Sequence, residues 1–254
     1  MSEAGELLDV AVAAARAASD VLVERYAHRA RGVATKSSPT DLVSEADLAA
    51  ERAIRDVLAA ARPDDAIVGE EGDDVAGSSG RRWIVDPLDG TVNYLFGIPQ
   101  WCVSVACEGE VGVILDPLHG ELFTVRAGEQ ALLDGEPLRG PEPRELGTAM
   151  VSTGFGYDAE VRAAQAAVVA RLLPQVRDIR RFGSAALDLA WTAAGRYDAF
   201  YEHGLNTWDR AAGEMLCLAV GLHVRDLAPL PATGPGILVA RGELIDELGA
   251  IVSA

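Results

Sequence analysis

Apolar residues recur every three to four positions along several stretches of the chain, and this spacing predicts helices that each bury one face. In residues 5–28, Leu7 and Ala11 begin such a stripe. A second helix is expected over residues 44–61, because Ser-Glu-Ala-Asp opens it like a capping box and Pro63 follows its end. Further helices, the last two followed by capping glycines, are expected at residues 159–173, 184–194 and 208–220.

Shorter runs rich in β-branched and aromatic residues, bounded by glycines, predict strands. Two buried strands are expected at residues 66–68 and 83–85, with an acidic, glycine- and serine-rich loop at 72–80 between them. The next four runs are separated by glycine turns and predict an antiparallel meander, over residues 102–107, 112–115, 121–125 and 131–133. Later strands are expected at residues 149–152, 199–201, 223–226 and 236–240.

A proline-rich segment, residues 136–147, is interpreted as a linker between two halves of one compact unit. The N-terminal half, residues 1–140, is then α+β and carries the acidic motifs described below. The C-terminal half, residues 141–254, is α/β. Residues 31–43 are polar, contain a proline, and are expected to form a connection. The pattern as a whole predicts layers of helices and sheets.

Composition narrows the function classes. The chain has 254 residues, of which 49% are hydrophobic and 24% charged, so a large core is expected. The net charge of −17 argues against nucleic-acid or anionic-membrane partners, which need basic surfaces. It would also repel a phosphorylated substrate unless a cation intervened, which makes a metal-dependent site more plausible.

Nothing in the sequence directs the chain out of the cytoplasm. The three cysteines form no Cys-x-x-Cys pair and are expected to be reduced and buried. No basic N-terminal region precedes an apolar stretch, and charged residues interrupt every apolar run well before the ~18 residues of a membrane span. A cytoplasmic protein is therefore predicted.

The motif with the clearest chemistry is Asp-Pro-Leu-Asp-Gly-Thr at residues 86–91, directly after an apolar run. Such a sequence can simply form a turn, but a turn does not account for the whole set. Asp86 and Asp89, with the carbonyl of Leu88, offer the hard oxygen ligands that Mg²⁺ prefers. Backbone N–H groups at Gly90 and Thr91 can bind an anion.

Two other acidic segments are interpreted together with this motif. Glu70 and Glu71 follow a predicted strand and alone would be read as solvated surface, but beside an aspartate pair Glu70 becomes a candidate ligand and Glu71 its support. Asp209 falls in the first turn of a predicted helix, with Thr207 as the expected N-cap. Its ordinary role would be a favourable interaction with the helix dipole.

Asp47 and Thr91 form a candidate pair that sequence spacing cannot establish. Asp47 fits a capping box with Ser44, and Thr91 fits a helix N-cap. If they meet in space, they could instead polarise a water molecule. The histidines lack the spacing of a zinc site, and neither a phosphate-binding Walker loop nor a serine-hydrolase elbow occurs.

Taken together, these blocks resemble the inositol monophosphatase family. The resemblance covers nearly the whole chain in the family's order. It includes residues 36–43 leading to Asp47, Gly-Glu-Glu at 69–71, the motif at 86–91, Gly-Ser-Ala-Ala-Leu-Asp at 183–188, residues 198–202, and Trp-Asp-Arg-Ala-Ala-Gly at 208–213. The resemblance implies an α-β-α-β-α layered fold, a homodimer, and Mg²⁺-dependent phosphate hydrolysis that Li⁺ inhibits.

The resemblance also implies two to three Mg²⁺ ions and their ligands. Glu70, Asp86 and the Leu88 carbonyl would hold the first ion. Asp86, Asp89 and Asp209 would hold the second, and Glu70 with water molecules a weaker third.

The remaining roles follow from the same resemblance. Thr91, oriented by Asp47, would act with Glu70 in catalysis by helping to activate the attacking water. Gly90 and Thr91 would bind phosphate through their backbone. Ala185, Glu202 and Asp209 would face the substrate, and Lys36 would belong to a lid formed by residues 31–43.

The predicted function is Mg²⁺-dependent hydrolysis of a small phosphorylated polyol, with inositol-1-phosphate as the leading substrate. Glu202 favours a polyol, because a carboxylate accepts hydrogen bonds from hydroxyl groups. Histidinol phosphate, a 3′-phosphoadenosine nucleotide and fructose bisphosphate remain alternatives. A scaffold protein that retains the fold is the alternative from another class.

Overall fold

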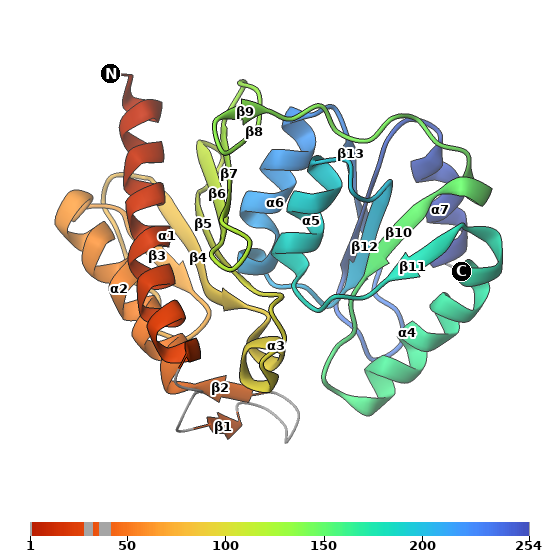
Figure 1. The fold of residues 1–254 in the computed structure, drawn as a ribbon, viewed down its shortest axis with the longest axis horizontal. Helices are drawn as coiled ribbons and strands as arrows, with labels where there is room; N and C mark the ends of the chain where they lie inside the picture. Colours follow the sequence, from red (N-terminus) through yellow and green to blue (C-terminus); the bar gives the residue numbers. More distant parts are fainter. Residues whose placement is uncertain (1, 28–32, 36–41, 254) are drawn as a thin grey trace.

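The computed structural model describes residues 2–27, 33–35 and 42–253. Within them, helices and sheets alternate in five layers (Figure 1). The outer helices on one side are α1 (Glu3–Ala27) and α2 (Glu45–Ala61), the central ones are α5 (Ala185–Ala193) and α6 (Thr207–Ala219), and those on the far side are α4 (Ala159–Leu172) and α7 (Leu244–Val252). The two sheets lie between these layers, which confirms the predicted α-β-α-β-α fold.

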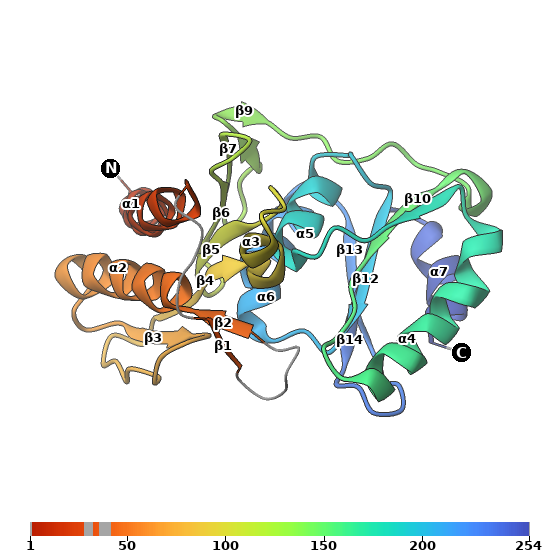
Figure 2. The same ribbon diagram turned by 60° about the horizontal axis from the view of Figure 1, so that its bottom comes forward.

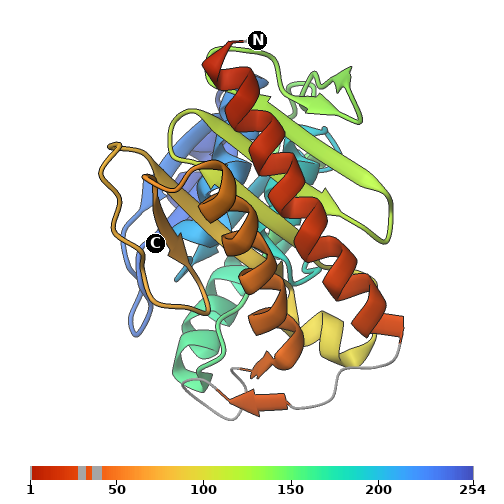
Figure 3. The same cartoon turned by 90° about the vertical axis from the view of Figure 1, so that its left-hand side faces the viewer.

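The first sheet has seven strands in the order β3-β4-β5-β6-β7-β8-β9. They are β3 (Ala66–Gly69), β4 (Arg82–Asp89), β5 (Cys102–Cys107), β6 (Val111–Asp116), β7 (Glu121–Arg126), β8 (Leu132–Leu133) and β9 (Glu136–Pro137). β3 and β4 are parallel, and every later pair is antiparallel, so the predicted meander is confirmed. α1 and α2 run side by side across the outer face of this sheet (Figure 3).

The second sheet has five strands in the order β11-β10-β12-β14-β13. They are β10 (Met150–Thr153), β11 (Asp178–Arg180), β12 (Ala199–His203), β13 (His223–Leu227) and β14 (Gly236–Ala240). β10 is parallel to both of its neighbours, whereas β14 is antiparallel to β12 and β13. α5 and α6 pack between the two sheets, which brings residues from both halves of the chain together.

The two longest N-terminal helices are held by complementary apolar faces. α1 buries small residues such as Ala11 and Ala15, and α2 buries Ile54 and Leu58 in the same core cluster. Small side chains let the helix backbones approach closely, and burial of the larger ones stabilises the pair by roughly 25 cal/mol for each Å² of apolar surface. α2 is therefore a rigidly placed element, which matters for the site described below.

Some elements differ from those predicted. The polar connection expected at 31–43 includes a short antiparallel pair, β1 (Val33–Thr35) with β2 (Leu42–Ser44). This pair lies at the same end of the molecule as α3 (Thr91–Phe96), a short helix that was not among the predicted elements (Figure 2). Thr91, considered from the sequence as a possible N-cap, is the first helical residue, and the N-cap is Gly90. The expected linker begins with strand β9, where Pro137 is tolerated because it lies at a sheet edge.

β11 and α7 were also not predicted. β11 has three residues, too few to show an alternating pattern. Cys102, Cys107 and Cys217 are all free and buried, as expected. None of the helices in the described part of the chain has the length and apolar character needed to span a bilayer.

Candidate active site

One cavity of about 550 Å³ lies where β4 ends and where α3, α5 and α6 begin. Its wall contains most of the candidate residues identified from the sequence: Glu70, Asp86, Leu88, Asp89, Gly90, Thr91, Ala185, Glu202 and Asp209. Asp47 lies behind this wall and is fully buried. Lys36, the expected lid residue, falls outside the described residues. The fold thus collects carboxylates from four separate chain segments at one place.

A β-bulge explains how both aspartates of the motif reach this cavity. Asp86 pairs with Ser104 and Asp89 pairs with Cys102, so three steps along β4 match two steps along β5. Successive residues of a regular strand face opposite sides, which would separate two residues three positions apart. The extra residue in the bulge brings both side chains to the same side.

The turn after β4 requires glycine at position 90. Gly90 has φ of +101°, and a Cβ there would lie 2.9 Å from the carbonyl oxygen of Gln100. α3 then begins at Thr91. Asn93, a residue that the sequence did not single out, donates from Nδ2 to the carbonyl oxygens of Gln100 and Phe182, both at 2.7 Å. This side chain therefore ties the motif to the C-terminal half.

The predicted pairing of Thr91 with Asp47 is present in the structure. The Oγ1 of Thr91 lies 2.9 Å from Oδ1 of Asp47 and 3.1 Å from the carbonyl oxygen of Leu88. Asp47 belongs to the first turn of α2, 44 residues before Thr91 in sequence. Its buried carboxylate therefore orients a hydroxyl group on the cavity wall.

Asp89 is held by the start of α5. Its Oδ2 accepts hydrogen bonds from the Oγ of Ser184 at 2.7 Å and from the backbone N–H of Ala186 at 2.6 Å. Ser184 is also the N-cap of α5 and accepts from the N–H of Leu187. A serine before a helix is a cap signal that sequence can reveal, but its second bond to Asp89 depends on the tertiary fold.

Asp209 occupies the third position of α6, and its N-cap differs from the prediction. The cap is Asn206 rather than Thr207, which is already helical. The Oδ2 of Asp209 accepts from the backbone N–H of Asn206 at 2.6 Å. One carboxylate oxygen thus serves the helix start, as in a capping box, while the residue lines the cavity.

Burial and mutual repulsion both disfavour the charged forms of these carboxylates. Burial raises the pKa of Asp86 well above its ordinary value, and the charges of Glu70 and Asp89 raise it further. Burial also raises the pKa of Asp89 to about 6, although its hydrogen bonds to α5 act in the opposite direction. The pKa of Asp209 is raised well above its ordinary value, first by burial and next by Asp89.

This electrostatic arrangement fits a site for divalent cations. Four carboxylates and one carbonyl group are hard oxygen donors, and a cation among them would relieve the repulsion that raises their pKa values. In the part of the chain that the structure describes, no three carboxylate, imidazole or thiolate groups already converge on one point as they do around a bound ion. The case for a cation site therefore rests on the oxygen donors of these residues and on the negative charge that their carboxylates share.

The C-terminal half also contributes Glu202 to the cavity wall. Glu202 on β12 lies against Gly154, where a Cβ would stand only 2.1 Å from its Oε2. Burial raises the pKa of Glu202 to about 8, Arg181 counteracts this, and Asp89 adds to it. The sequence indicated Glu202 through the family resemblance, but the space provided by Gly154 was not evident.

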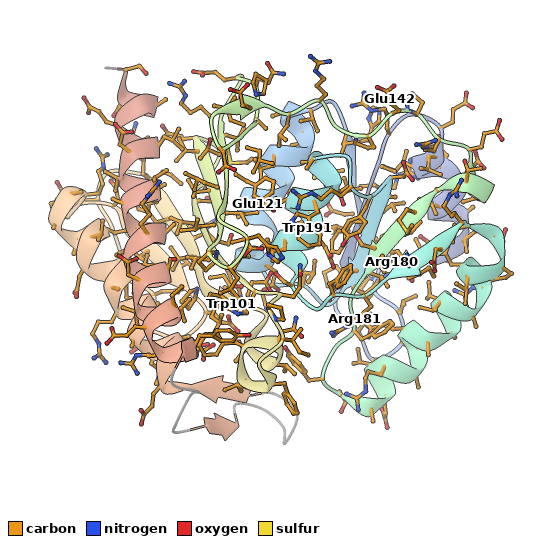
Figure 4. The ribbon with its side chains drawn as sticks, viewed as in Figure 1. Trp101, Glu121, Glu142, Arg180, Arg181 and Trp191 are labelled. Carbon is orange, nitrogen blue, oxygen red and sulfur yellow. The ribbon has the colours of Figure 1, made fainter. Side chains whose placement is uncertain are left out.

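Arg181 is a further feature that sequence reasoning missed. It lies on the segment between β11 and α5 (Figure 4) and is the permanently cationic residue among those described along the cavity wall. Its guanidinium group lies 5.6 Å from the centre of the Phe155 ring. The sequence gave no sign that Arg181 would line the cavity, because β11, the strand that directly precedes it, was not predicted.

The same combination of fold and motifs occurs in known proteins. Residues 3–250 match the model of the inositol monophosphatase family. The chain is 43% identical over 231 residues to inositol-1-monophosphatase SuhB of Mycobacterium tuberculosis H37Rv, covering 85% of this chain and 79% of that protein. It is 39% identical over 226 residues to Nus factor SuhB of Escherichia coli K12, covering 87% and 85%. The crystal structure of extragenic suppressor protein suhB from Bartonella henselae aligns with a TM-score of 0.88 at 35% identity, covering 97% and 98%.

Proposed function

The chain belongs to the inositol monophosphatase family and is a phosphoric monoester hydrolase, and we propose that it hydrolyses inositol-1-phosphate to inositol and phosphate with the help of Mg²⁺. The observation that carries this proposal is the single cavity that joins four carboxylates to the Thr91–Asp47 pair. Glu202, on the wall of the same cavity, favours a substrate with several hydroxyl groups.

The proposed metal ligands are Glu70, Asp86, Asp89, Asp209 and the Leu88 carbonyl, which together would hold two to three ions. When bound, Mg²⁺ would neutralise charge on the phosphate and lower the pKa of a nearby water molecule. Asp89 can offer Oδ1 to a cation, because its Oδ2 is engaged by the start of α5. Homodimer formation and inhibition by Li⁺ belong to the same proposal and rest on the family resemblance, whereas the proposed cytoplasmic location rests on the sequence features described above.

Thr91 has the role of guiding a proton. Its hydroxyl group donates to Asp47, so the free lone pairs of Oγ1 can accept a hydrogen bond from water in the cavity. A proton leaving that water can pass to Oγ1 while the Thr91 proton moves toward Oδ1 of Asp47. Gly90 and Thr91 would hold the phosphate oxygens through their backbone N–H groups.

The experiment is phosphate release from a panel of substrates, with and without Mg²⁺ and with added Li⁺. The panel contains inositol-1-phosphate, histidinol phosphate, 3′-phosphoadenosine-5′-phosphate and fructose-1,6-bisphosphate. Arg181 gives a specific reason to include the bisphosphate, because a second phosphate group needs a cation. Fastest Mg²⁺-dependent release from inositol-1-phosphate would support the proposal, and a preference for another substrate would replace it.

A second candidate is a binding role alongside or instead of catalysis. Relatives from Salmonella typhimurium and Escherichia coli carry the name Nus factor SuhB, which does not describe a phosphatase. If no member of the panel released phosphate under any condition, this scaffold role would become the leading proposal.

A further inference from the structure

Glu51 lies one helical turn after Asp47 on α2 and is almost completely buried, with 2% of its surface exposed. Its Oε2 accepts a hydrogen bond from the backbone N–H of Glu71 at 2.7 Å. Its Oε1 accepts from the Nε of Arg55, also at 2.7 Å. This carboxylate therefore spans from α2 to the segment that follows β3 and carries Glu70.

The segment after β3 is shaped around the Glu51 carboxylate. A Cβ at Gly69 would lie 2.8 Å from both carboxylate oxygens, and a Cβ at Gly72 would lie 2.7 Å from Oε1. Such distances are too short for any side chain to occupy without moving its neighbour. The glycines on either side of Glu70 and Glu71 thus leave space for a buried carboxylate to reach the backbone between them.

We propose that Glu51 is a positioning residue, which fixes the loop of residues 69–72 so that Glu70 faces the metal-binding end of the cavity. A charge-assisted hydrogen bond to a backbone N–H is stronger and more directional than one between neutral groups. Groups that orient a metal ligand from behind typically change metal affinity by about 10- to 100-fold when they are altered. This inference rests on the proposed function, because it assigns Glu70 to a Mg²⁺ site.

The chain offers a matched control for a purely structural role. Asp65, at the opposite end of β3, is another buried carboxylate that is paired with a partly exposed arginine. It accepts from the Nε of Arg62 at 2.9 Å and from the Nε1 of Trp83 at 2.9 Å. Glu51 and Asp65 therefore bracket the same strand with similar burial and partners, but Glu51 alone bonds to the loop that carries Glu70.

The test compares Glu51→Gln with Asp65→Asn in the full-length protein. Mg²⁺ affinity is measured by isothermal titration calorimetry, and thermal stability is measured with a chelator present. Hydrogen exchange at the Glu71 amide is followed in the metal-free protein. We expect both variants to lower Tm, but Glu51→Gln alone to weaken Mg²⁺ binding by about tenfold or more and to speed exchange at Glu71.

Mg²⁺ binding that is equally tight in wild type and Glu51→Gln would overturn the inference while leaving the proposed function intact. Absence of Mg²⁺ binding by the wild type would overturn both, because there would be no metal ligand to position. If Glu51→Gln does not fold, Glu51→Asp replaces it, because Asp keeps a carboxylate beside Arg55 but is one methylene shorter than the side chain that reaches the N–H of Glu71. Mg²⁺ affinity weakened by about tenfold or more would then support the inference, and unchanged affinity would overturn it.

Discussion

Replacing Glu202 with Gln should make the thermal stability of the metal-free protein less sensitive to rising pH. Burial raises the pKa of Glu202 from its ordinary value of 4.5 to about 8. The folded protein therefore holds a proton here over a pH range in which the unfolded chain has released it. The stability that Glu202 contributes is complete below about pH 4.5 and is lost progressively as the pH rises to about 8.

The size of the effect follows from the difference between these two pKa values. One pKa unit corresponds to about 1.4 kcal/mol, so the entire range is worth at most about 5 kcal/mol in the free energy of unfolding. Between pH 6 and pH 8 the expected loss is about 2 kcal/mol. For a chain of this length, that corresponds to a fall in Tm of about 4–8 °C. Gln keeps the shape of Glu but cannot ionise.

The assay is thermal unfolding of wild type and Glu202→Gln between pH 5 and pH 9 with a chelator present. Wild type should lose more Tm than the variant across this range, because Gln cannot ionise and because Asp188 and Asp209, whose pKa values are raised first by burial and also by the charge of Glu202, lose that repulsion in the variant. Glu247→Gln, a change on the exposed face of α7, controls for the loss of a carboxylate in general. Parallel curves for wild type and Glu202→Gln would refute the link between burial of this carboxyl group and stability.

Three further substitutions test other parts of the site. Asp86→Asn should abolish phosphate release while raising the Tm of the metal-free protein, because a buried charge repelled by its neighbours is removed. Retained activity in steady-state kinetics would contradict the assignment of Asp86 as a metal ligand. Thr91→Ala should lower kcat by about 10²- to 10⁴-fold and leave Mg²⁺ affinity unchanged, whereas Thr91→Ser should retain most of the wild-type kcat. Equal kcat values in the two variants would exclude a role for the Thr91 hydroxyl in proton transfer. Gly154→Ala should displace Glu202 and raise KM for inositol-1-phosphate by about tenfold or more, but leave KM for p-nitrophenyl phosphate nearly unchanged. An equal rise in KM for both substrates would argue against a role for Glu202 in recognising the polyol.

Sequence patterns predicted the long elements well, because each buries a continuous apolar face. The pattern over residues 5–28 and the glycine turns of the meander correspond to α1 and to strands β5–β8. α3 and β11 were missed because six and three residues are too few to establish a period. β9, with only two residues, was missed for the same reason, whereas β8 was expected at residues 131–133 and pairs with both β7 and β9.

Local motifs predicted most of the carboxylates that the structure places on the cavity wall, but not what holds them in place. The bulge that brings Asp86 and Asp89 to the same side depends on pairing with β5. The hydrogen bond from Ser184 to Asp89 joins positions 95 residues apart. Sequence spacing contains no information about such contacts, because they arise only when two elements pack together. The Thr91–Asp47 pair was foreseen as a possibility, and the structure supplies its 2.9 Å contact.

The placement of α2 gives these contacts a common origin. Asp47 and Glu51 are four residues apart and therefore share one face of the helix, and this face is buried. Asp47 bonds to Thr91 at the start of α3, whereas Glu51 bonds to the loop after β3. One helix thus sets the separation between Asp47, the proposed proton acceptor, and the loop that carries Glu70. Because α2 is itself fixed by packing of Ile54 and Leu58 against the core, a cavity created at Ile54 should disturb both contacts together. Ile54→Val should then lower kcat and also weaken Mg²⁺ binding, although residue 54 lies outside the cavity wall.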